Sequence, residues 1–276
     1  MSASETRQKA REALAGKWGK AALVTLVFSL ITGALNAVLG YIPFIGGIAQ
    51  LLLEIPLAFG FAATLIKLMR GEEIGYLDFF STGLSNFKGS WLVTLWTAIK
   101  LIVPIILMII FYVVIIAGAL LAIQDSPYGA TITSSQTLTP EQLSVYLQNI
   151  PANQLNSTSL IMIVVGFIGL IASAIWLTVK NYLYKPAFFI LFDNPDKAPK
   201  EIVEDSAKIM TGNRWKYFCL ELSFIGWAIL ASLTCGIGML WLIPYTIVAQ
   251  VCLYEFLSGK KADNSTTVEQ TEETAE

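Results

Sequence analysis

The sequence predicts an all-α protein, a polytopic helical membrane bundle with about six transmembrane helices. Composition is the first reason: 55% of the 276 residues are apolar and 14% are charged, with a mean hydropathy of +0.64. A soluble domain has roughly 25% charged residues. The second reason is a set of six apolar runs, each near the roughly 20 residues that cross about 30 Å of hydrocarbon. The third is the placement of the basic residues.

Seventeen of the eighteen Lys and Arg residues fall on one side of this six-helix arrangement. They precede the first run, lie at the end of the second or between it and the third, lie between the fourth and fifth, or follow the sixth, and Lys100 is the one exception. Cationic segments stay in the cytoplasm during membrane insertion. The pattern therefore predicts that both termini are cytoplasmic.

The first hairpin is predicted from Ala21 to Gly40 and from Ile45 to Met69, with a tight turn between them. Pro56 and Gly60 predict a kink in its second helix, because proline removes a backbone donor.

The third span is predicted from Trp91 to Ile123, and its excess length implies tilt, a kink at Pro104 or an interfacial start. The fourth runs from Leu160 to about Leu177, with continuation to Phe192 as an alternative. The last two spans are Tyr217 to Thr234 and Met239 to Leu257. The turn between them is so short that they must form an antiparallel hairpin.

A helix-like lead precedes each odd-numbered span, and a Gly and a Trp follow each lead. The leads are Glu5 to Ala15, Tyr76 to Phe87 and Pro199 to Met210, and the tryptophans, predicted as interfacial anchors, are Trp18, Trp91 and Trp215. One interpretation is a unit of amphipathic lead, Gly breaker, Trp anchor and spanning hairpin, repeated three times, and the pattern of the third lead suits a helix lying in the membrane interface. The other is that Gly and Trp are simply common at membrane boundaries.

These elements predict three regions: a cytoplasmic amphipathic segment at 1–20, a six-helix transmembrane domain at 21–257, and a disordered acidic tail at 258–276. The domain includes a polar external loop at 124–158, with one expected surface helix near Glu141 to Asn149. Its cytoplasmic loop at 180–216 begins with Lys180 and Lys185, two further candidate anchors. That loop favours either a specific lipid pocket or ordinary positive-inside anchoring.

Two charged residues lie near the middle of predicted spans, Glu54 in the second and Lys100 in the third. A charge at that depth costs roughly 2.5–3.5 kcal/mol on insertion scales, so pairing or a wet cavity is the usual remedy. Three interpretations stay open: a transport gate, a structural pair, or two independent residues, with Lys100 extending towards the cytoplasm and Glu54 protonated.

Several chemistries are not supported by the residues present. The chain has no histidine, so His-based catalysis and His-ligated metal sites are excluded. Its three cysteines are widely spaced within predicted spans and are interpreted as buried thiols. We expect no catalytic residue, no cofactor and no metal site, and the dispersed basic residues do not form a nucleic-acid motif.

Motifs in two parts of the chain resemble a known bacterial family. The motifs are Met69-Arg70-Gly71-Glu72, Asp193-Asn194-Pro195, Met210-Thr211-Gly212-Asn213, Leu222 to Trp227, Gly236-Ile237-Gly238 and Trp241 to Tyr245. The chain resembles domain-of-unknown-function family nine-seven-five, a group of multi-pass membrane proteins, over most of Arg11 to Leu257. This resemblance implies a bacterial plasma membrane and no established activity. The family is distantly similar to the membrane domain of some glycerophosphoryl diester phosphodiesterases, whose soluble barrel and histidines are missing here.

The expected function is therefore a non-enzymatic accessory or scaffold protein that binds membrane lipids, other membrane proteins or a second copy of itself. The alternative is a small-molecule or lipid transporter with a polar path around Asn36, Glu54 and Lys100. A continuous cavity reaching Glu54 or Lys100 would favour transport, and a closed apolar core would favour the scaffold.

Overall fold

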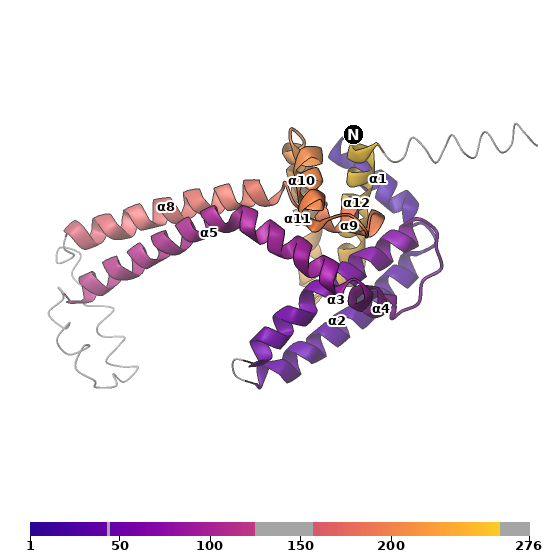
Figure 1. The fold of residues 1–276 in the computed structure, drawn as a ribbon, viewed down its shortest axis with the longest axis horizontal. Coiled ribbons are helices and arrows are strands. Elements are labelled where there is room, and N and C mark those ends of the chain that lie inside the picture. Colours follow the sequence, from indigo (N-terminus) through magenta and orange to yellow (C-terminus); the bar gives the residue numbers. More distant parts are fainter. Residues whose placement is uncertain (43–44, 125–156, 260–276) are drawn as a thin grey trace, which may run out of the picture. The chain divides into compact units, whose positions relative to one another are not determined.

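The computed structural model describes residues 1–42, 45–124 and 157–259, and these residues form helices joined by turns (Figure 1). Six helices are long and apolar enough to cross a membrane by length and composition. They are α2 (Trp18–Gly40), α3 (Ile45–Met69), α5 (Phe87–Gln124), α8 (Ser157–Asn181), α11 (Arg214–Leu233) and α12 (Met239–Ser258). The all-α, multi-pass prediction is confirmed.

Four shorter helices lie between these spans: α1 (Ala3–Ala13), α4 (Asp78–Ser85), α9 (Ala187–Asp193) and α10 (Pro199–Met210). Three of them are the expected leads. Gly16 and Gly212 break the chain after α1 and α10 in the left-handed conformation that glycine favours, with φ of 74° and 81°. Gly89, in contrast, lies inside α5, so the expected Gly breaker is wrong for the second lead.

The described residues form two compact units. One comprises those of Met1–Ile99 and Asn181–Glu276, and the other those of Lys100–Lys180. The expected helix near Glu141 to Asn149 and the tail after Gly259 lie outside the described residues.

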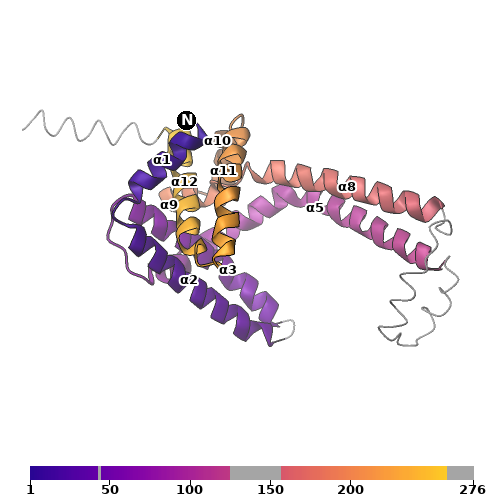
Figure 2. The ribbon, with the colours of Figure 1, turned by 180° about the vertical axis from the view of Figure 1, so that it is seen from behind.

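The second unit is a helical hairpin of α8 and the part of α5 from Lys100 onwards, which lie side by side in both views (Figures 1 and 2). Glycines allow the close approach. A Cβ at Gly166 would lie 2.6 Å from Ile115 Cγ1, and one at Gly169 would lie 2.2 Å from the Phe111 ring. Small residues at a helix interface are typical of membrane helices, where packing rather than hydrophobic burial holds the pair together.

Burial in the first unit is concentrated at one end of its hairpins. In α3, most residues from Leu57 to Leu68 are buried, whereas Ile48 and Leu51 nearer the turn are exposed. In α2, α11 and α12 the buried residues are likewise concentrated in the half of the helix away from the hairpin turn. We call this packed end the base; it comprises 18–25 of α2, 56–69 of α3, 217–224 of α11 and 244–254 of α12. The turn ends expose apolar side chains, as expected of a surface that faces lipid.

The base is closed by an unusually close crossing of α3 and α4. A Cβ at Gly60 would lie 1.9 Å from the Phe79 carbonyl oxygen, and one at Gly83 would lie 2.5 Å from the Pro56 carbonyl oxygen. Only residues without a side chain let these backbones meet. The Gly60 that the sequence marked as part of a kink is therefore also the contact point for α4.

Two of the three leads bury their apolar faces in protein. Ile202 and Val203 of α10 are buried where that helix packs on α9 and α12, and Thr6 and Ala10 of α1 are buried against α11 and α12. The base therefore covers the apolar faces of these two leads, while the position of the third lead, α10, in the membrane interface stays a prediction.

The lead around α4 differs from the other two. Phe79 and Gly83 face α3, but large apolar side chains on and beside α4 stay exposed. They are Tyr76, Leu77, Phe80, Leu84 and Phe87, and we call them the α4 apolar face. Lys88 lies next to this face and is exposed.

Candidate functional site

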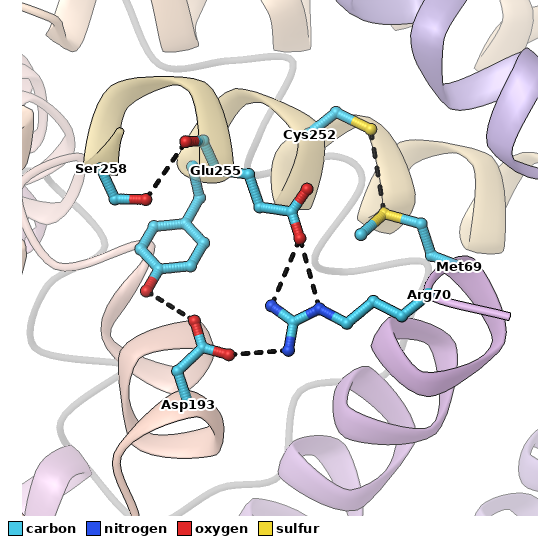
Figure 3. Close-up of polar contacts among 7 residues, drawn as sticks. Met69, Arg70, Asp193, Cys252, Glu255 and Ser258 are labelled. Atoms are coloured by element: carbon cyan, nitrogen blue, oxygen red, sulfur yellow. Dashed lines mark hydrogen bonds and ion pairs between the residues drawn. The ribbon is translucent and has the colours of Figure 1, made fainter. Parts of the chain in front are cut away.

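An ion cluster joins three elements at the edge of the base (Figure 3). Arg70, directly after α3, places Nη1 2.8 Å from Asp193 Oδ1 at the end of α9. Its Nη2 and Nε both lie 3.3 Å from Glu255 Oε1 of α12. Tyr254 Oη donates to Asp193 Oδ2 at 2.9 Å, and Arg70 also lies over the Phe192 ring, 5.6 Å from its centroid.

The cluster sets one cation, Arg70, against two carboxylates and is largely withdrawn from solvent. The side chain of Asp193 is 5% exposed and that of Arg70 is 32% exposed. Burial by itself would lower the pKa of Arg70, but its hydrogen bond and ion pair with Asp193, together with Glu255, outweigh burial and raise that pKa. A permanently protonated guanidinium held by two carboxylates offers no general base and no nucleophile. The arrangement acts as a cross-link between α3, α9 and α12.

A second polar group holds the start of the 180–216 loop against α11. Lys185 Nζ lies 3.1 Å from Glu221 Oε1, and Tyr182 Oη donates to Glu221 Oε2 at 2.8 Å. Burial and then the Glu221 carboxylate raise the pKa of Tyr182 to about 12. Lys185 therefore has a protein partner in addition to its predicted interfacial position. Lys180 lies over the Trp176 ring, 5.1 Å from its centroid, within the second unit.

The three predicted tryptophan anchors have different surroundings. Trp215 is 71% exposed and tilts against Phe218, while Trp18 packs edge-on to Tyr245 at 5.7 Å. Trp91 has a more specific role: its Nε1 donates to the Leu52 carbonyl oxygen at 3.0 Å. In a regular helix that carbonyl would accept from residue 56, which is a proline without an N–H. Trp91 therefore satisfies the acceptor that the kink leaves open.

The role of the Trp91 N–H as a replacement for the missing N–H of Pro56 can be tested by mutation. Trp91→Phe should lower the thermal stability of the purified protein by about 1 kcal/mol, the usual net contribution of a hydrogen bond. In a Pro56→Ala background the residue 56 N–H can bond Leu52 itself, so Trp91→Phe should then have little effect. Equal losses in both backgrounds would show that Trp91 acts only through its apolar contacts.

Glu54 lies in the exposed half of α3 and lines a small cavity inside the first hairpin. The cavity measures about 30 Å³, and Thr32, Asn36 and Gln50 also line it. A water molecule needs at least 10–15 Å³ on this scale, so there is room for about two. The structure thus brings Asn36 and Glu54 together. Lys100 belongs to the second unit, so its pairing with Glu54 stays a prediction.

A larger groove of about 390 Å³ lies within the first unit, between α1 and α2 on one side and α11 and α12 on the other. Its lining is mainly apolar and aromatic, with Arg11, Trp18 and Tyr245 at one end and Trp227, Trp241 and Gly238 further along. Over 1–42, 45–124 and 157–259, no group of three or more Cys, Asp or Glu side chains is placed to hold a metal ion.

A family model described as Protein of unknown function (DUF975) matches residues 1–261. The chain belongs to this family. No curated protein and no solved structure matches it.

Two of the motifs that carry the resemblance to DUF975 meet in the ion cluster. Arg70 comes from the Met69 to Glu72 motif, and Asp193 opens the Asp-Asn-Pro motif. Sequence reasoning did not place them together, because they are far apart in the chain and each is an ordinary loop residue by itself. The available signal was that each charge follows directly on an apolar helix.

Proposed function

We propose that this DUF975 protein is a non-enzymatic scaffold of the bacterial plasma membrane that binds lipids and partner proteins. The observation that carries the proposal is the closed base. Phe59, Leu65 and Leu253 are among its fully buried side chains, and the Arg70 cluster and the Lys185–Glu221 pair cross-link the elements around it. A core fixed in this way suits a rigid platform better than a protein that alternates between two packings.

The polar groups near Glu54 give less support to transport. Their cavity has room for about two water molecules, and all the residues that line it belong to α2 and α3. A transport path needs a cavity that extends towards both membrane surfaces, usually at an interface between repeats. Among the described residues of the first unit, the groove beside α1 is lined by different residues and does not include Glu54.

The α4 apolar face supports contact with lipid. Five large apolar side chains, between 37% and 58% exposed, surround a short helix whose other face is fixed on α3. Aromatic rings beside an exposed lysine are typical of the headgroup boundary. This face would hold the base at the membrane surface, where its other surfaces can meet partner proteins.

The experiment compares two activities of one preparation. Affinity-purified full-length protein should carry lipid and protein partners detectable by mass spectrometry. Reconstituted into vesicles under an imposed pH gradient, it should produce no proton flux above empty vesicles. A flux that disappears in Glu54→Gln would overturn the scaffold and establish proton-coupled transport instead.

A further inference from the structure

The groove beside α1 has a charged end and an apolar end. Arg11 is exposed, and over the described residues its guanidinium makes no hydrogen bond or ion pair. Beyond Trp18 and Tyr245 the lining becomes apolar, with Trp227 54% exposed and Trp241 46% exposed. A molecule that fits must have an anionic head and an apolar chain.

The charged end is fixed against the middle of the last hairpin. Tyr245 Oη donates to the Arg7 carbonyl oxygen at 3.2 Å, and Arg7 Nη1 lies 3.4 Å from the Ser223 carbonyl oxygen. α1 therefore packs along the base halves of α11 and α12. Its exposed side chains include Lys9 and Arg11, which cannot enter hydrocarbon at low cost. The hydrocarbon layer then begins near Tyr245.

Only a short part of the hairpin extends beyond that level. From Tyr245 to Gly238 there are about seven residues, or about 10 Å at 1.5 Å per residue. One leaflet contributes about half of the roughly 30 Å hydrocarbon core. By contrast, α2 has 23 residues from Trp18 to Gly40, enough to cross the whole layer. At about 10 Å the groove is thus shallow enough to lie within a single leaflet.

We propose that this groove binds one anionic phospholipid of the leaflet beside α1, which the charge pattern makes the cytoplasmic one. Its phosphate lies at Arg11 and its acyl chain passes between Trp227 and Trp241 towards Gly238. The α11–α12 hairpin then enters this leaflet without crossing the other, which departs from the two full spans expected from its length. The inference deepens the lipid-binding part of the proposed scaffold function.

A lipid-exchange experiment tests the site. Full-length protein in detergent is mixed with dioleoyl-phosphatidylglycerol or dioleoyl-phosphatidylcholine, and bound lipid is counted by native mass spectrometry. Arg11→Gln should lower phosphatidylglycerol binding about fivefold, the effect of one basic residue at a membrane surface. Lys9→Gln removes the same charge from α1 outside the groove and should leave binding unchanged. Trp241→Ala should weaken binding of both lipids.

Three results would overturn the site. They are equal losses in Arg11→Gln and Lys9→Gln, equal binding of the two lipids to the unaltered protein, and displacement of phosphatidylglycerol by millimolar inorganic phosphate. The first two would show that α1 attracts lipid only through its general positive charge, and the third would show that the ligand is free phosphate. None of them would produce a proton flux, so failure of the lipid site is distinct from failure of the scaffold proposal.

The depth of the hairpin gives a second readout. Cys235 is exposed at the α11–α12 turn, so its interpretation as a buried thiol is wrong. Cys219→Ser with Cys252→Ser leaves it as the only thiol. An impermeant maleimide should label a cysteine placed at Ser134 in the predicted external loop of intact cells. Cys235 should react only after detergent is added. Labelling of Cys235 in intact cells at the rate seen for position 134 would show a full crossing and overturn the single-leaflet site.

Discussion

Gly60→Ala should destabilise the purified protein by roughly 1–3 kcal/mol, although it adds a single methyl group. The added Cβ would lie 1.9 Å from the Phe79 carbonyl oxygen and 2.8 Å from the Gly83 backbone nitrogen. Both obstacles are backbone atoms, so no rotamer change relieves the clash. α4 must move away from α3, and the thermal unfolding midpoint in detergent should fall by several degrees.

Gly226→Ala is the matched control. Gly226 also lies inside an apolar helix, α11, but nothing is within 4 Å of an added Cβ there. Alanine is the better helix former by up to about 1 kcal/mol, so this variant should be as stable as the parent or slightly more stable. If Gly60→Ala and Gly226→Ala behave alike, the backbones of α3 and α4 do not meet at Gly60.

Local signals in the sequence were sufficient for the six spans and the three leads, but not for α9 or for the start of α5. Runs of apolar residues gave the spans, and Pro199 and Gly212 gave the limits of α10. The surroundings of each helix could not be predicted in the same way. Amphipathicity identifies the apolar face of α10, but Ile202 and Val203 would look the same whether they met lipid or protein. Only the fold shows that the base covers them.

The candidate sites depended on contacts distant in the chain. The depth of Glu54 follows from counting residues along α3, but the direction of its side chain does not. That direction depends on how α2 and α3 are rotated about their axes, which also decides that Asn36 and Gln50 are its neighbours. The hydrogen bond from Trp91 to Leu52 depends on two residues far apart in the chain, a proline at 56 and a tryptophan at 91. Nothing local indicated that they would meet.

Arg70→Met should be the most damaging change of a single charged residue at the edge of the base. It removes the guanidinium that neutralises Asp193, whose side chain is 5% exposed. Breaking a buried ion pair from one side costs roughly 3–5 kcal/mol. Because the Arg70 side chain is 32% exposed, we expect a loss at or somewhat below the lower end of that range. The measurement is the thermal unfolding midpoint of purified protein.

Two further variants decide whether the loss comes from the ion pair. Lys208→Met removes a lysine that is 76% exposed and pairs with Asp205 at 3.3 Å, so it should cost at most about 1 kcal/mol. Asp193→Asn keeps an oxygen for the Tyr254 hydroxyl but removes the charge. Arg70→Met with Asp193→Asn should therefore be milder than the sum of the single changes, with coupling of about 0.5–3 kcal/mol between residues in contact. Strictly additive losses would mean that Arg70 acts through Glu255 and through packing on Phe192, and the cross-link between the two DUF975 motifs would have no electrostatic basis.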